Sequence, residues 1–378
     1  MKDEVMAICA AQMYQIRNRL AAMDFGDIDK NALRDSLCAM ADVIHGSNLK
    51  GLNTQQQLDK KCEIEQFTEW MFYLMSSRNL MIPLEMEFVV RELLRFWLGH
   101  SLDQLVLVFV EGSFAVTRFN KIPIGISSLE ARYGIRFAKD PVFISIPRYC
   151  KQDFLFNIAL FHEIGHVVDQ QLNLYHDVKE AVKQQTGYDS SKKLIRDFFP
   201  ILHKAGRVDE KILISYIKEY IADLFSAQYL GEYLLTYLDY LEPHQKKPGS
   251  VTHPSYIHRK KMINDLLACM RSPNHMTSNF LLQYIMDSFS SAGKGDLILR
   301  WTAIHGRELM MGQSVSLNSL DELFSVFKHS WDVVFNGINN IEAARGLAAN
   351  SLSCFDFYYS INTGIQNGIS ALRARIAP

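Results

Sequence analysis

The chain has few cysteines, and none of them is paired at short spacing. Among its 378 residues there are six cysteines and no C-x-x-C unit: Cys9, Cys38, Cys62, Cys150, Cys269 and Cys354. Several lie within apolar helical patterns, which is typical of reduced thiols in cytosolic proteins rather than of a disulfide framework. We therefore expect a cytoplasmic protein without structural disulfides or cysteine-based metal sites.

The sequence also lacks an excess of charge and long apolar runs. Its 40 basic and 41 acidic side chains give a formal net charge of −1, so it has no electrostatic footprint for nucleic acid. No apolar run reaches the roughly 18–20 residues that cross a bilayer, so we expect no transmembrane segment. The first 20 residues are amphipathic and carry early acidic residues, unlike a secretory signal peptide. With 48% hydrophobic and 21% charged residues, the composition is typical of a soluble globular protein.

The sequence does contain an H-E-x-x-H pattern, spanning residues 162–166 within the apolar stretch 153–172. On a helix, His162 and His166 share one face. Imidazoles at this spacing can hold one zinc ion through nitrogen bonds of about 2.0–2.1 Å. Glu163 can reach a metal-bound water and act as its base. The pattern therefore indicates a hydrolytic metal site.

The helix that carries these histidines is predicted to be buried on most sides, because apolar residues surround the pattern. Asp153 is its candidate N-cap. Gly165 costs about 1 kcal/mol inside a helix, which is reasonable if another backbone passes close by. A chance match on an ordinary amphipathic helix is the alternative. Polar residues within such an apolar helix are costly unless paired or ligated, which favours the metal site.

A second segment, residues 209–241, is predicted to form one long helix with two carboxylates in its apolar stripe. Glu219 is a candidate third metal ligand, since an unpartnered buried carboxylate is expensive. Asp223, one turn later, could accept a hydrogen bond from a ligating histidine. Alternatively, both carboxylates are exposed and form salt bridges. His176 and Glu180 are weaker candidates for the third ligand. They lie in a polar segment, about residues 173–208, for which we expect one short helix in a solvated connector.

A histidine at the entry to the next helix is the remaining candidate catalytic residue. His253 follows a turn and could hydrogen-bond a developing oxyanion. Arg259, later in the same stretch, could pair with a carboxylate of the ligand helix. The alternative is helix capping by Thr252 or Ser255, with His253 as an ordinary surface residue.

The predicted fold class is α+β, mostly helical, in three regions. Residues 1–100 are expected to form four helices and residues 273–378 a helical C-terminal region, in which Ser319 and Glu322 make a capping box. Residues 101–272 are the expected metallopeptidase core. Three stretches in it, 105–110, 113–119 and 141–146, are predicted strands of a small antiparallel sheet. Residues 142–146 are the candidate edge, where an extended peptide could add as a strand.

The segments HEIGH, EYIAD and THPSYIHR together resemble the gluzincin metallopeptidases, most of all the CAAX-type and heat-shock-type zinc endopeptidases. Those enzymes carry H-E-x-x-H, a downstream E-x-x-x-D and a later His-Pro stretch. A weaker likeness extends to ImmA/IrrE-type and phage-exclusion peptidases. The resemblance implies a zincin-like core in which His162, His166 and Glu219 bind Zn²⁺ and Glu163 is the base. Asp223 would support a ligand, and His253 would stabilise the transition state.

These observations predict a zinc-dependent endopeptidase acting on a protein or peptide substrate, of narrow regulatory or defence (toxin) type. The helical flanks allow a regulatory protein partner. The alternative is a non-catalytic helical scaffold or interaction protein with a structural or vestigial metal site. Structural zinc normally has four protein ligands. The sequence offers three convincing ones, which favours catalysis.

Overall fold

The computed structural model divides the chain into two compact units. The first comprises Met1–Glu87 and Ser101–Gln152, and the second Phe88–His100 and Asp153–Pro378. Residues 101–152 and 153–272 of the expected core therefore fall in different units. The structure describes residues 3–47, 52–77, 84–99, 104–111, 115–117, 126–147, 153–155, 157–189, 191–199, 209–241, 249–250, 252–271, 279–292, 308–309, 313–345 and 354–376.

The first 100 residues contain the four helices predicted from their apolar periodicity. They are α1 (Asp3–Ala21), α2 (Ile28–Gly46), α3 (Thr54–Ser77) and α4 (Leu84–Leu98). The Asp27 side chain caps α2 by accepting a hydrogen bond from the backbone N–H of Lys30 at 2.9 Å. Helices α1, α2 and α3 pack on one another, with Leu37 and Leu74 fully buried. This bundle belongs to the first unit, and α4 runs from the first unit into the second.

The three predicted strands are present, but the sheet they form is mixed. Strands β1 (Gln104–Glu111) and β3 (Asp140–Pro147) pair in parallel over their whole length. Strand β2 (Ala115–Thr117) pairs antiparallel with β3, giving the order β1-β3-β2. Parallel pairing needs a crossover rather than a tight turn, and the helix α5 (Ile126–Tyr133) lies in the connection before β3. Because β3 is the central strand, the expectation that residues 142–146 form an edge is wrong.

The predicted α+β, zincin-like core with a small antiparallel sheet is therefore wrong. Over the described residues the protein is predominantly helical, and its strands are only eight, three and eight residues long. They belong to the first unit and pack on α3. There the ring centroids of Tyr73, on α3, and Phe143, on β3, lie 5.4 Å apart. The helix that carries the H-E-x-x-H pattern belongs to the second unit. None of the described helices is long and apolar enough to cross a bilayer.

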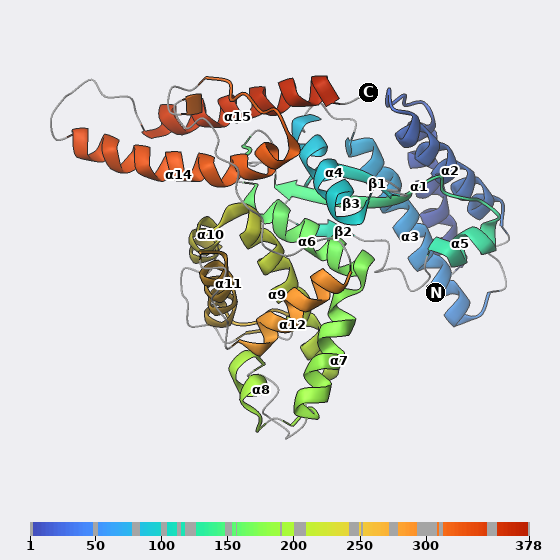
Figure 1. Ribbon diagram of the computed structural model, residues 1–378. Coiled ribbons are helices and arrows are strands. Elements are labelled where there is room, and N and C mark those ends of the chain that lie inside the picture. Colours follow the sequence, from blue (N-terminus) through green and yellow to red (C-terminus); the bar gives the residue numbers. More distant parts are fainter. Residues whose placement is uncertain are drawn as a thin grey trace. The chain divides into compact units, whose positions relative to one another are not determined.

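The second unit is built around the pair α6 (Ile158–Leu172) and α9 (Glu210–Leu230), which pack closely together. Every residue of α9 from Glu219 to Leu230 is buried. Three further helices cover α9 (Figure 1): α7 (Leu174–Thr186), α11 (Tyr256–Arg271) and α14 (Leu320–Arg345). A Cβ atom on Gly165 would lie 2.8 Å from the Cα of Ala222. The expectation that another backbone passes close to this glycine is confirmed.

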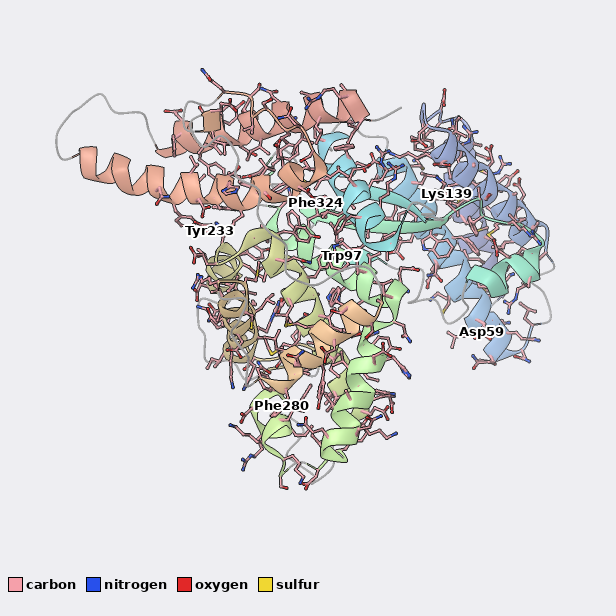
Figure 2. The ribbon with its side chains drawn as sticks, in the orientation of Figure 1. Asp59, Trp97, Lys139, Tyr233, Phe280 and Phe324 are labelled. Atoms are coloured by element: carbon pink, nitrogen blue, oxygen red, sulfur yellow. The ribbon has the colours of Figure 1, made fainter. Side chains whose placement is uncertain are left out.

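A cluster of aromatic rings anchors the C-terminal half of α9. The indole N–H of Trp97, from α4, donates a hydrogen bond to the Tyr229 hydroxyl at 2.5 Å. The ring of Phe324, from α14, lies 5.9 Å from that of Tyr229. Trp97 and Phe324 are labelled in Figure 2. Because such rings bury large apolar areas, this cluster fixes the position of α9 within the second unit.

The N-terminus of α6 differs from the prediction. The helix begins at Ile158 with Asn157 as its N-cap, so Asp153 is not the cap. The Asp153 carboxylate instead accepts hydrogen bonds from the Tyr358 hydroxyl at 2.7 Å and the Asn362 amide at 3.2 Å. Both partners belong to α15 (Cys354–Ile376). Partners some 200 residues away hold this carboxylate, and local helix-capping signals cannot show them.

Two segments contain more helices than expected. The predicted helix 209–241 is interrupted by Gly231, whose φ of +62° favours glycine, and continues as α10 (Tyr233–Leu241). The polar segment after α6 forms both α7 and α8 (Lys193–Phe198) instead of one short helix. In the C-terminal region α12 spans Phe280–Ser291. Half of the capping box expected at α14 is present, since the Ser319 hydroxyl accepts from the Glu322 backbone N–H at 3.2 Å. The Glu322 carboxylate accepts from the backbone N–H of Asn318 at 2.6 Å, one residue before Ser319.

The close approach at Gly165 predicts the effect of Gly165→Ala. Alanine has the better helix propensity by about 1 kcal/mol, but overpacking a core typically costs 1–3 kcal/mol. The backbone of α9 cannot rotate away, so we expect a net loss of about 1 kcal/mol in the free energy of unfolding, measured by urea denaturation. Gly46→Ala is the matched control, because no atom lies within 4 Å of its Cβ position. Unchanged stability of Gly165→Ala would show that the two helices are not in tight contact.

Candidate metal centre

Three side chains from α6 and α9 converge in the second unit. The Nε2 atom of His162 lies 3.4 Å from Oε2 of Glu219, and Nε2 of His166 lies 3.3 Å from Oε1. The two imidazole rings are 4.7 Å apart and nearly perpendicular. One ligand atom from each residue lies within 4.8 Å of the other two. These three residues could therefore hold a metal ion.

The environment of Glu219 fits a bound cation. The residue is only 8% exposed, and its Oε2 atom has no hydrogen-bond partner among the described residues. Leaving a buried carboxylate oxygen uncompensated is costly. Two imidazole nitrogens and a carboxylate form a donor set that divalent metals accept. A metal ion here would complete the interactions of Oε2, which the described residues leave with only the imidazole of His162, 3.4 Å away and outside hydrogen-bond geometry.

Behind the cluster, Asp223 and Arg259 form the pair expected from the sequence. Asp223 is fully buried on α9, and its Oδ1 atom lies 3.0 Å from Nδ1 of His162. Arg259, from α11, binds the same carboxylate through two nitrogens, at 2.7 and 2.6 Å. Paired guanidinium and carboxylate groups of this geometry are strong and directional. Arg259 thus fixes Asp223, and Asp223 faces the ring nitrogen of His162 that points away from Glu219.

The electrostatics of the metal-free cluster favour one bound proton. Burial lowers the pKa of His162, but Asp223 and Glu219 outweigh it and raise that pKa to about 10. Burial lowers the pKa of His166, so this imidazole is neutral near pH 7. Burial also opposes ionisation of Glu219, yet the two imidazoles hold its pKa well below the usual range. Below pH 10, both ring nitrogens of His162 are therefore protonated, and a metal ion would have to displace one of the two protons.

His253 lies on the solvent-exposed side of the cluster. Its side chain is 55% exposed, and its Nε2 atom is 3.7 Å from Oε1 of Glu219. The Thr252 hydroxyl lies 2.8 Å from its Nδ1 atom. The turn is tied to α9, because the Tyr216 hydroxyl donates a hydrogen bond to the carbonyl of Ser250 at 2.8 Å. The anchoring of this turn by Tyr216 was not predicted from the sequence. The one available signal was its position one helical turn before Glu219 on the same face.

Glu163 and the two alternative ligands occupy different environments. Glu163 follows His162 on α6, is partly exposed, and its negative charge acts to raise the pKa of His166. It thus lies close enough to influence the cluster. His176 is exposed on α7, and Glu180 pairs with its neighbour Lys179 at 3.2 Å. In the described part of the chain, neither joins the three converging residues.

Comparisons of the chain with protein-family models, curated proteins and solved structures find no match. The interpretation of the cluster therefore depends on its own geometry and chemistry.

The raised pKa of His162 predicts proton release when metal binds. At pH 6.0, where zinc-bound water with a pKa of about 7 stays largely intact, we expect binding of one zinc ion to release about one proton. Titration calorimetry in buffers of different ionisation enthalpy measures this number. His176→Ala should leave it unchanged, whereas His162→Ala should abolish the release and weaken binding. A binding enthalpy independent of the buffer would contradict the assigned protonation.

Proposed function

We propose that this protein is a zinc-dependent endopeptidase. The observation that carries the proposal is the convergence of His162, His166 and Glu219, with Glu163 adjacent on the same helix. Two histidines and a glutamate with room for a further ligand are typical of catalytic zinc sites. A structural zinc site normally has four protein ligands, and among the described residues three form the cluster.

The residues around the cluster have complementary chemical roles. When bound, zinc supplies Lewis-acid chemistry, polarising the scissile carbonyl and lowering the pKa of a water molecule. Glu163 accepts the proton of the attacking water and returns it to the leaving amine. In the tautomer whose Nδ1 accepts a hydrogen bond from the Thr252 hydroxyl, the His253 ring carries its proton on Nε2. This N–H, on the exposed side of the site, donates to the developing oxyanion.

Asp223 and Arg259 position the ligand His162. Oδ1 of the ionised Asp223 lies 3.0 Å from Nδ1, so its charge favours a proton on Nδ1 and leaves Nε2, which faces Glu219, to bind a metal ion. Arg259 keeps Asp223 ionised. Burial raises the pKa of this carboxyl, but the guanidinium and His162 lower it by more, so the pKa stays below its usual value. The chain Arg259–Asp223–His162 therefore prepares one imidazole for metal binding.

The substrate we propose is a protein or peptide, cleaved with narrow specificity in a regulatory or defence role. The segments HEIGH, EYIAD and THPSYIHR support this choice through their resemblance to gluzincin peptidases. A cytoplasmic location and a regulatory partner that binds the helical flanks remain predictions. We assign no role in substrate binding to the sheet of the first unit.

Replacing the proposed base tests the function. Glu163→Gln keeps the size of the side chain but cannot accept a proton, so proteolysis should fall by roughly 10²- to 10⁴-fold while zinc content stays at that of the wild type. Cells expressing either protein are compared by quantitative proteomics for cleaved peptides, and the zinc content of each purified protein is measured.

Glu180→Gln is the matched control, because it makes the same chemical change at a partly exposed residue of α7 outside the cluster and should leave cleavage intact. Equal cleavage by Glu163→Gln would disprove the role of the base. A wild-type protein that binds zinc but generates no cleavage products would favour the scaffold alternative.

A further inference from the structure

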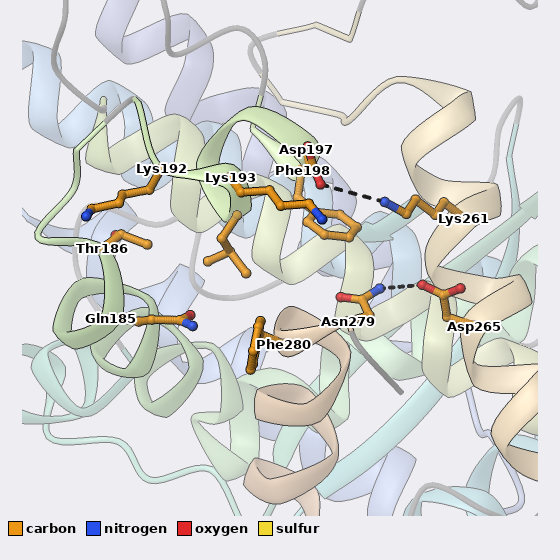
Figure 3. Close-up of a pocket in the computed structure, with 11 residues that line it drawn as sticks. Gln185, Thr186, Lys192, Lys193, Asp197, Phe198, Lys261, Asp265, Asn279 and Phe280 are labelled. Atoms are coloured by element: carbon orange, nitrogen blue, oxygen red, sulfur yellow. Dashed lines mark hydrogen bonds and ion pairs between the residues drawn. The ribbon is translucent and has the colours of Figure 1, made fainter. Parts of the chain in front are cut away.

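A second candidate site lies away from the metal cluster but within the same unit. A cavity of about 310 Å³ opens between the C-terminal end of α7, α8, α11 and the start of α12 (Figure 3). None of the residues that line it belongs to the proposed metal site. Its volume lies at the lower end of the range for small-molecule pockets, about 300–1,000 Å³. We propose that this cavity binds a small aromatic phosphate.

The charges around the cavity favour an anion. Both lining carboxylates have partners: Asp197 lies 4.0 Å from Lys261, and Asp265 accepts a hydrogen bond from the Asn279 amide at 2.6 Å. Lys192 and Lys193 are exposed. Lys192 lies near the carboxylate of Asp189 and helps to lower its pKa, whereas Lys193 forms no ion pair among the described residues. With Lys261, the cavity is lined by three lysines and two aspartates, so the lining carries a net charge of +1.

The kind of cation favours phosphate over carboxylate. Among the described lining residues, lysines alone supply positive charge, so these residues lack the planar guanidinium with which arginine binds a carboxylate through two nitrogens. A lysine ammonium is a compact donor that suits the several oxygens of a phosphate group. In Figure 3 Lys193 extends across the cavity toward Phe198, and Gln185 presents its amide from α7. Both groups therefore offer hydrogen-bond donors to a ligand in the cavity.

The exposed ring of Phe280 supplies a surface for an aromatic ring, while the ring of Phe198 is already covered by the ammonium group of Lys261 at 4.8 Å. Phe198 is buried and forms part of the wall, with its backbone carbonyl accepting a hydrogen bond from the Tyr220 hydroxyl at 2.8 Å. The Tyr220 ring packs edge-on against Phe198, 6.1 Å away. Phe280, at the first turn of α12, is 57% exposed beside the cavity and is labelled in Figure 2. A ligand ring that packs on Phe280 would cover apolar surface that is now in contact with water.

Titration calorimetry with phenyl phosphate tests the proposal, with inorganic phosphate and phenol as comparison ligands. We expect one molecule of phenyl phosphate to bind per chain, at least about tenfold more tightly than either comparison ligand. Lys193→Gln removes a charge-assisted contact and Phe280→Ala removes the stacking surface, so each should weaken binding by about tenfold or more. Lys211→Gln, an equal charge change at an exposed residue in the first turn of α9, outside the cavity, should have no effect.

Three results would overturn the proposal: no saturable binding of phenyl phosphate, equal affinity for inorganic phosphate, or affinities unchanged in Lys193→Gln and Phe280→Ala. An equal loss in Lys211→Gln would show attraction by overall charge, and would also refute a defined site. Thermal unfolding of each variant confirms that it is folded. Because binding is read without any measurement of proteolysis, failure of the peptidase proposal leaves this test intact.

Discussion

The contact between α6 and α9 at Gly165 is the constraint on which the candidate site depends. The Cα atom of Ala222 lies 2.8 Å from the position that a side chain at residue 165 would occupy. This approach places His162 and His166 on one helix opposite Glu219 on the other. Helices with larger residues at the contact pack 8–10 Å apart, and an increase of a few tenths of an ångström separates donors from acceptors. Glycine at residue 165 therefore lowers the helix propensity of α6, but it allows the close approach of α9 that brings the two histidines to Glu219.

Electrostatics explain why this arrangement calls for a cation. Glu219 and Asp223 lie one turn apart and are almost completely buried, and buried charges require compensation. Arg259 compensates Asp223 with two short contacts. Among the described residues, Glu219 is compensated only by imidazoles, which become cationic by binding a proton. A divalent ion would replace that proton with a larger charge, so the same interactions that raise the pKa of His162 favour metal binding.

Local spacing was enough to predict the residues of the cluster. His162 and His166 follow from one turn of helix, and Glu219 and Asp223 from the high free energy of burying two carboxylates in an apolar stripe. The pairing of the strands was not predictable, because parallel and antiparallel partners can share the same apolar pattern and the α5 connection was missed. The role of Asp153 depends on partners in α15. The lysine-lined cavity forms only where four separate helices meet. Features of this kind are determined by long-range contacts that no local pattern contains.

The coordination of a bound zinc ion tests the central claim most directly. Zinc-edge X-ray absorption on the purified, zinc-loaded protein determines the number and type of ligand atoms. The account predicts two imidazole nitrogens at about 2.0–2.1 Å, one carboxylate oxygen and one water oxygen. A third imidazole, from His253, in place of the water would indicate a closed structural site, and sulfur ligands or no bound zinc would contradict the assignment altogether.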